Sequence, residues 1–191
     1  MKVTLLDYTQ NPVDAIGAAS AICYNAKIDR ESNIKRAIHC KDKGHLATMR
    51  FAYATFHIEG ISRVCSHQLV RVAHAGILQE SQRYVEQSHV KFITPPSIEE
   101  LPKKIKARWE KLIYESQEVY AWSVNYGMKK EDARYALLQS CTTQLNICMN
   151  FQGWNDFLRN RTSKTAQWEI RDVAIEIQRQ LAEIAPGIFE A

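Results

Sequence analysis

The sequence lacks the patterns that mark several large classes of protein. It contains no run of about 18 apolar residues, so we expect no membrane-spanning helix and no membrane partner. Its first residues, MKVTLLDYTQNP, hold no long apolar segment and predict a first strand, not a signal peptide. It has no GxGxxG and no GxxxxGK[ST] stretch, which argues against a nucleotide held by a Rossmann fold or a P-loop.

The cysteines and histidines form no pattern of metal ligands or nucleophiles. The five cysteines are odd in number and include no Cys-x-x-Cys pair. Reduced thiols and a cytoplasmic location therefore fit better than a disulfide scaffold or a zinc ribbon. His67 and His74 lack the spacing of His-Glu-x-x-His, and we expect no metal. Ser81 has no local base, and a catalytic thiolate has little support.

Apolar periodicity predicts an α+β fold with a small mixed or antiparallel sheet and several long helices, in one domain over residues 1–191. Asn11-Pro12 opens the first helix, because proline suits the first helical position. Ser97 and Glu100 form a capping box that predicts the start of the longest helix, and Gly127 is expected to end it. Asn150 is expected to cap a later helix. The other expected elements are strands at 2–8, 50–58 and 144–149, an extended segment at 83–94, and helices at 32–44, from 63 through Arg71, at 133–138 and at 165–184.

The predicted long helix carries large aromatic residues on more than one face. They are Trp109, Tyr114, Tyr120, Trp122 and Tyr126. A monomer of 191 residues would not cover all of them, so we expect a homo-oligomer.

Arginines and amide side chains gather in two segments. Arg71 precedes the segment QESQRY, which contains Arg83, and Arg161 follows Asn150 closely. Arginine presents a planar fork of donors that matches phosphate oxygens, while glutamine and serine both donate and accept at the edge of a nucleobase. This mixture indicates a nucleotide ligand. The net charge is only +4, and the lysines near residue 104 lack interleaved aromatics, so we expect no nucleic-acid partner.

Several stretches, in order along the chain, resemble the flavin-dependent thymidylate synthases. They are NPVDAIGAASAICYN, GHLATMRFAYATFHIEGISRVCSHQLVR, QESQRYV, and the C-terminal MN and AQWEIR with Arg161 between them. The resemblance covers nearly the whole chain. It implies the fold of that family and a homotetramer with sites at the subunit interfaces.

The resemblance also implies a reaction and its site. The family methylates dUMP to dTMP with methylenetetrahydrofolate as carbon donor, and NADPH reduces the FAD that supplies the hydride. Arg161 would be catalytic, lying against the uracil and stabilising its negative charge. Contacts to dUMP would come from Gln68, Arg71, Gln79, Glu80, Ser81, Gln82, Arg83 and Arg134. Contacts to FAD would come from His45, Arg71, His74, Gln79, Asn150, Gln152 and Asp156.

The departures from the family signature fall mainly on the flavin side. The signature is Arg-His-Arg, seven residues, then Ser; Arg71 and Ser81 keep this separation, but Val72 and Ala73 replace the His-Arg. The other departures are Gln152 in place of an arginine, Asp156 in place of His or Asn, Arg50-Phe51 in place of Glu-His, and Gly76 in place of serine.

Each lost arginine contact to a phosphate is worth about 1.5–3 kcal/mol. Either FAD is held by other groups or more weakly, or the cofactor or the chemistry differs. Two alternatives to dUMP methylation follow: a related C5 methylase or hydroxymethylase acting on UMP or a cytidine nucleotide, and a non-catalytic nucleotide-binding homologue.

Overall fold

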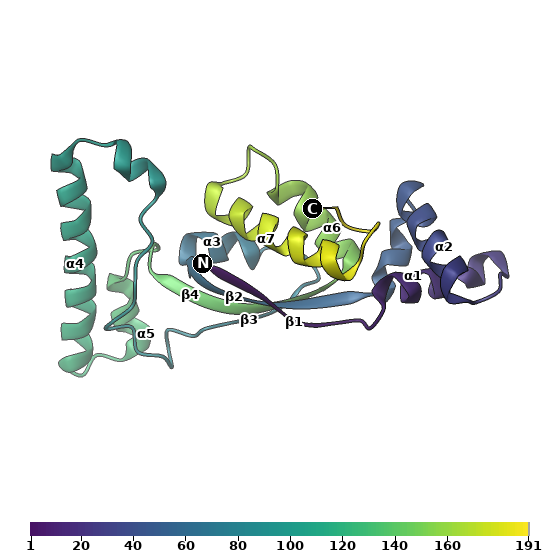
Figure 1. Cartoon of the computed structure of the whole chain (residues 1–191). Helices are drawn as coiled ribbons and strands as arrows, with labels where there is room; N and C mark the ends of the chain where they lie inside the picture. Colours follow the sequence, from purple (N-terminus) through teal and green to yellow (C-terminus); the bar gives the residue numbers. More distant parts are fainter. Residues whose placement is uncertain (191) are drawn as a thin grey trace. The chain divides into compact units, whose positions relative to one another are not determined.

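The computed structural model describes residues 1–190, which form a four-stranded sheet and a set of helices (Figure 1). The strands are β1 (Lys2–Tyr8), β2 (Tyr53–Ser62), β3 (Gly76–Gln79) and β4 (Thr142–Asn150). The α-helices are α1 (Pro12–Ala21), α2 (Arg30–Asp42), α3 (Arg63–Leu69), α4 (Lys103–Asn125), α5 (Lys130–Ala133), α6 (Phe151–Arg161) and α7 (Trp168–Ile184). The 3-10 helices are η1 (Ile22–Tyr24), η2 (Leu46–Phe51), η3 (Pro96–Glu100) and η4 (Arg134–Ala136).

The sheet is antiparallel, and its strand order is β1-β2-β4-β3. The residues of β2 and β4 pair in opposite directions. Phe151 N donates to Ala52 O near one end of the strand pair, and Arg63 N donates to Cys141 O near the other. The architecture is therefore α+β with a small antiparallel sheet, as the sequence predicts.

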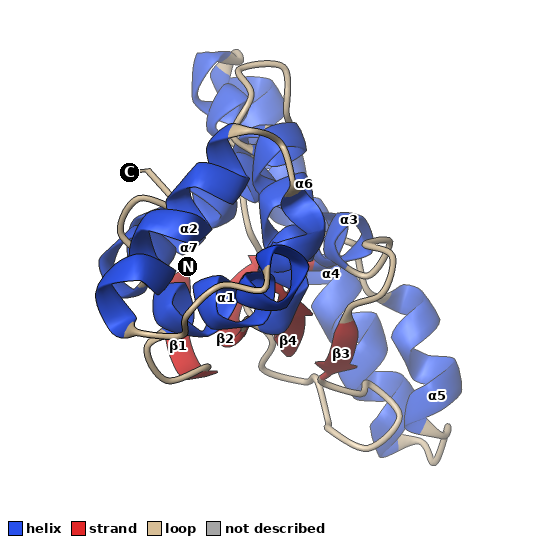
Figure 2. Ribbon diagram, turned by 90° about the vertical axis from the view of Figure 1, so that its right-hand side faces the viewer, coloured by secondary structure: helices blue, strands red, loops and turns tan. Residues whose placement is uncertain are grey.

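The chain divides into two compact units. The first comprises Met1–Ile58, Gln68–Leu78 and the chain from Leu145 onward, and its core lies between the sheet and helices α6 and α7. Both helices lie on the same face of the strands (Figures 1 and 2). Trp154 of α6 is fully buried; its ring meets Phe56 edge-on at 5.0 Å and its Nε1 donates to Ala54 O at 3.0 Å. This packing fixes the orientation of α6.

The rest of this core consists of buried residues at alternate positions of the strands and at helical spacing in α7. Leu145, Ile147 and Met149 are buried at every second position of β4. The buried residues of α7 recur at helical spacing and are Glu169, Ile170, Val173, Ala174, Ile177 and Leu181. Helix α7 also contacts the edge strand, because Gln180 donates to Val3 O and accepts from Leu5 N.

The second unit comprises Glu59–His67 and Gln79–Gln144. Helix α4 is held there by side chains that reach the neighbouring loop. Gln87 N donates to the hydroxyl of the buried Tyr120, and Gln117 Nε2 donates to Ser88 O at 2.9 Å. Ser116 Oγ donates to Ala136 O at 2.7 Å, which holds η4 against the same helix.

Several expected helix boundaries are confirmed. Pro12 occupies the first helical position of α1, and Asn150 caps α6 by accepting from Gly153 N at 2.9 Å. Gly127, with φ of +88°, follows the end of α4. No helix within residues 1–190 is long and apolar enough to cross a membrane.

The expected start of the longest helix is wrong. Ser97 and Glu100 lie within η3, no side chain caps either η3 or α4, and α4 begins at Lys103. Pro102 explains the difference. Proline disfavours the helical region for the residue before it, and Leu101 is extended at ψ 154°.

Other boundaries also differ from those expected. Strand β2 runs from 53 to 62 instead of 50 to 58, because residues 46–51 form η2. Residues 83–94 form turns with one isolated bridge, Phe92 to Cys141, while β3 at 76–79 was not expected. Helix α3 ends at Leu69, so Arg71 follows the helix instead of belonging to it. The short helix expected at 133–138 is replaced by α5 and η4 over 130–136.

Candidate functional site

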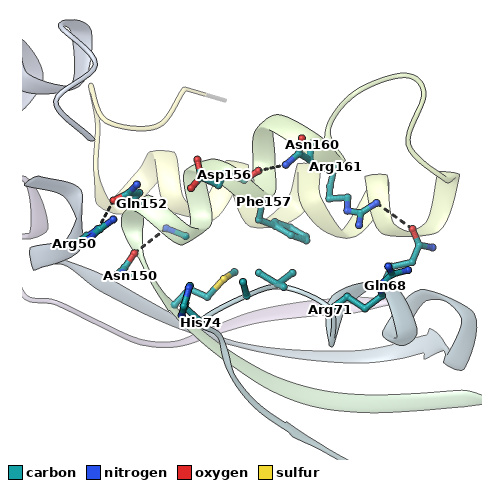
Figure 3. Close-up of a pocket in the computed structure, with 14 residues that line it drawn as sticks. Arg50, Gln68, Arg71, His74, Asn150, Gln152, Asp156, Phe157, Asn160 and Arg161 are labelled. Carbon is teal, nitrogen blue, oxygen red and sulfur yellow. Dashed lines mark hydrogen bonds between the residues drawn. The ribbon is translucent and has the colours of Figure 1, made fainter. Parts of the chain in front are cut away.

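The first unit contains a cavity of about 800 Å³, which we call the main cavity (Figure 3). Its lining comes from η2, the end of α3 and the loop after it, the end of β4, and α6. The lining residues are Arg50, Gln68, Arg71, Val72, Ala73, His74, Met149, Asn150, Gln152, Gly153, Asp156, Phe157, Asn160 and Arg161. This volume is typical of a site for a small organic ligand.

Helix α6 forms one wall of the main cavity. One face of this helix is polar and lines the cavity, and the other face is apolar and buried. Gln152, Asp156 and Asn160 recur every four residues on the cavity side, whereas Trp154 and Leu158 are buried. The loop opposite is short and sharply turned, with His74 at φ of +61°. The polar stripe of α6 therefore faces a ligand-sized space.

Three arginines give the main cavity a positive character. At one end Arg50 Nε donates to Gln152 Oε1 at 2.6 Å. At the other end the Arg161 guanidinium lies 3.5 Å from Gln68 Oε1, a long and weak hydrogen bond, and Arg71 lies beside it (Figure 3). Asp156 is the only carboxylate among the described lining residues.

The middle of the main cavity is apolar. Val72, Ala73, Met149 and Phe157 are the apolar side chains of its lining, and Phe157 lies between the two ends (Figure 3). Met149 and Phe157 are buried, at 3% and 4% exposure, so their cavity surfaces are firmly held. An apolar planar group could therefore lie between two polar ends.

The structure brings together seven of the residues named from the sequence. The residues that share the main cavity are Gln68, Arg71, His74, Asn150, Gln152, Asp156 and Arg161. His45 belongs to the same unit but does not line this cavity. It is exposed, and its carbonyl accepts from Thr48 Oγ1 at 2.9 Å.

Sequence reasoning did not name Arg50, Phe157 or Asn160 as site residues. Arg50 was noted only as a departure from the family pattern. Its place in the cavity depends on a contact between residues 102 positions apart, which no local pattern shows. The helical spacing of Asn160 from Asp156 and Gln152 was the one available signal.

The remaining expected residues lie in the second unit, where the amides and Glu80 are held by hydrogen bonds. Gln79 Nε2 donates to Ser66 Oγ at 2.9 Å and to Thr143 Oγ1 at 3.1 Å. The Glu80 carboxylate accepts from Gln144 Nε2 at 2.8 Å and from Gln87 Nε2 at 3.2 Å. These side chains are therefore fixed in position.

Two arginines expected to contact the nucleotide, Arg83 and Arg134, both donate to Glu131. Arg83 Nε donates to the Glu131 carboxylate at 3.0 Å, and Arg134 Nε donates to the Glu131 carbonyl at 3.0 Å. Ser81 Oγ accepts from Arg83 N at 3.3 Å. Since Arg83 and Glu131 are both well exposed, this ion pair contributes little to stability and leaves donors for a ligand.

A second cavity, of about 330 Å³, lies within the second unit. Arg63, His67, Gln82, Arg134 and Cys141 are among its lining residues. Arg63 donates to Glu80 O at 2.8 Å, but its buried Nε has no partner among the described residues. Burial lowers the pKa of Arg63 and raises the pKa of the Cys141 thiol, with the nearby Arg63 charge partly offsetting the latter.

No group of three or more His, Cys, Asp or Glu side chains that could hold a metal ion occurs within the described part of the chain.

Comparison with known proteins gives consistent matches over nearly the whole sequence. The family described as "Thymidylate synthase complementing protein" matches residues 4–187. Three relatives are each named flavin-dependent thymidylate synthase. The protein from Pyrococcus furiosus is 35% identical over 96% of this chain and 80% of its own length. The protein from Thermococcus kodakarensis is 36% identical over 96% and 79%, and that from Geobacter sulfurreducens is 34% identical over 99% and 85%.

Proposed function

Because this chain belongs to the flavin-dependent thymidylate synthase family, a family of enzymes, we propose that it converts dUMP to dTMP. The carbon donor is methylenetetrahydrofolate, the flavin is FAD, and NADPH is the reductant. The 1–191 chain forms one domain of this family, with the family's fold, and works in the cytoplasm as a homotetramer whose sites lie at subunit interfaces.

The observation that supports this proposal best is the main cavity. It joins an arginine-rich end, an apolar middle and an amide-rich end within a volume that suits a flavin ring and a nucleobase. The FAD isoalloxazine is planar and has a large apolar surface, which fits a lining that includes Val72, Ala73 and Phe157. Asn150 and Gln152 supply amide groups that suit polar groups of the cofactor. The residues present therefore fit a flavin.

In the proposed reaction FAD, held by lining residues of the main cavity and reduced by NADPH, would supply the hydride that completes the methyl group. The protein supplies position and charge. C5 of uracil is a weak nucleophile, and it becomes stronger when negative charge on the ring is stabilised. Arg161 is proposed to lie at the edge of the base and to stabilise that charge, and Gln68 Oε1 lies 3.5 Å from the Arg161 guanidinium.

Binding of the nucleotide is assigned to the residues that the family resemblance names. The residues proposed to contact dUMP are Gln68, Arg71, Gln79, Glu80, Ser81, Gln82, Arg83 and Arg134. Arginine forks hold phosphate and sugar and so restrict the motion of the ring, which lowers the entropic part of the barrier.

An absorbance spectrum of the purified protein tests the flavin part of this proposal. FAD is added, unbound flavin is removed, and spectra are recorded with and without dUMP. We expect a flavin spectrum that changes shape when dUMP is added, because Arg71 is proposed to contact both ligands. A colourless protein after this treatment would favour a non-catalytic homologue, and a response to UMP or dCMP but not dUMP would favour a different pyrimidine nucleotide.

A further inference from the structure

Arg50 is a fixed cation without a counter-charge. It lies in η2, lines the main cavity and is exposed. Its Nε donates to Gln152 Oε1 at 2.6 Å, which restricts the guanidinium plane. A guanidinium has five N–H donors, so four remain. Within residues 1–190 no carboxylate forms an ion pair with Arg50, which leaves its charge available to a ligand.

Arg50 is also isolated from the other cations of the cavity. Arg71 and Arg161 lie at the opposite end, beside Gln68 (Figure 3). Among the described lining residues, no second arginine or lysine lies at the Arg50 end. The amide side chains that Figure 3 shows near Arg50, those of Asn150 and Gln152, are uncharged, so Arg50 is the fixed positive charge that an anionic group would meet at this end.

The net charge of the lining also favours an anion. Three arginines oppose one carboxylate, that of Asp156, so the cavity carries an excess of two positive charges with His74 left uncounted. Asp156 lies four residues after Gln152 on α6, about one turn along the helix. Arg71 and Arg161 are assigned to the nucleotide in the proposed function, which leaves Arg50 for a second anionic group and Asp156 to accept hydrogen bonds from hydroxyl groups.

We propose that Arg50, held in place by Gln152, binds the diphosphate of FAD at this end of the main cavity. The inference rests on the proposed function. A ligand with a planar apolar ring in the middle and a diphosphate at the Arg50 end matches the positions of Phe157 and Arg50 along the cavity in Figure 3. Arg50 is thus a binding residue that makes the site select a flavin nucleotide over the uncharged flavin.

Titrations with two flavins test this role without measuring turnover. Riboflavin carries the same ring as FAD but no phosphate. In Arg50→Gln the Kd for FAD should rise about 10-fold or more, because a charge-assisted contact is lost, while the Kd for riboflavin stays within twofold. Arg50→Lys keeps the charge and loses the planar fork. Its Kd for FAD should therefore lie between that of the unmodified protein and that of Arg50→Gln.

Arg159→Gln is the matched control. Arg159 lies on α6 but does not line the cavity and is exposed, so the variant removes the same charge elsewhere. Its Kd for FAD should stay within twofold of the unmodified protein. Circular dichroism of each variant should match that of the unmodified protein, because Arg50 is exposed and its loss leaves the core intact.

Three results would overturn the inference: an Arg50→Gln variant that binds FAD as tightly as Arg159→Gln does, an equal loss of riboflavin and FAD, or an Arg50→Lys variant no better than Arg50→Gln. NADP⁺ carries a diphosphate too, and a loss of NADP⁺ binding in place of FAD binding would also contradict it. A protein that binds FAD through Arg50 but forms no dTMP would refute the proposed reaction and leave this inference standing.

Discussion

Arg161 is half-buried at the arginine-rich end of the main cavity, with Gln68 Oε1 3.5 Å from its guanidinium. Its planar fork can meet two atoms at the edge of a base at once, which a lysine ammonium cannot do. Arg161→Lys should therefore lower kcat by ~100-fold or more at saturating dUMP, although the charge is kept. The exposed neighbour Arg159→Lys is the control. Turnover of Arg161→Lys within threefold of the unmodified enzyme would remove Arg161 from the chemistry.

The cysteines offer a second prediction at the scale of single residues. Burial raises the pKa of Cys141, so this thiol stays protonated at neutral pH and is a poor nucleophile. The sequence around the other four shows no histidine pattern typical of a catalytic cysteine. Replacing each of the five with serine or alanine, one at a time, should leave dTMP formation measurable. Complete loss of turnover in a variant with an unchanged circular dichroism spectrum would indicate a covalent cysteine mechanism instead.

At the scale of elements, α1 and α2 are packed backbone to backbone through Gly17. A Cβ at Gly17 would lie 1.9 Å from Asn33 O of α2, and backbone cannot yield as a flexible side chain does. Gly17→Ala should therefore lower the free energy of unfolding by about 2 kcal/mol or more, even though alanine normally favours a helix. Denaturant titration measures this change.

Ala19→Gly in the same helix provides the comparison. This substitution lowers helix propensity by about as much as Gly17→Ala raises it, and it creates no clash. It should lower the free energy of unfolding by about 1 kcal/mol. A Gly17→Ala protein as stable as the unmodified one would mean that α1 and α2 are not in this close contact.

Much of the element pattern could be predicted because its signals are local. Pro12 at the start of α1, Asn150 at the start of α6 and alternation in β4 each depend on a few neighbouring residues. The start of α4 was missed because Pro102 overrides the Ser97 capping signal, and β3 was missed because four residues carry too little pattern.

The candidate site divides in the same way. The stripe on α6 and the residues around Arg71 could be found from sequence, whereas Arg50 reaches the cavity only through the packing of η2 against α6. That contact joins distant parts of the chain and has no local signature.

At the scale of the whole molecule, α4 and the turn after it expose a cluster of apolar side chains. Val119, Trp122, Tyr126 and Met128 are 46%, 57%, 92% and 50% exposed. Such a cluster is costly in water and is typical of a surface that another subunit covers. Trp122→Glu should therefore lower the molar mass measured by light scattering below that of the proposed tetramer.

Lys104→Glu on the same helix is the control for added negative charge, since Lys104 is exposed and lies away from this cluster. Its molar mass should equal that of the unmodified protein. A Trp122→Glu protein that keeps the full mass would place the subunit contacts on another surface.

The proposed reaction as a whole is tested most directly by following the donated carbon. The protein is incubated with FAD, NADPH, dUMP and methylenetetrahydrofolate labelled with ¹³C at the methylene carbon, and the nucleotides are analysed by mass spectrometry. A parallel reaction omits FAD, and others replace dUMP with UMP or dCMP. We predict labelled dTMP from dUMP, formed only when FAD is present. Labelled 5-hydroxymethyl-dUMP, a product from UMP or dCMP alone, or no labelled nucleotide from a protein that binds both FAD and dUMP would contradict the proposal.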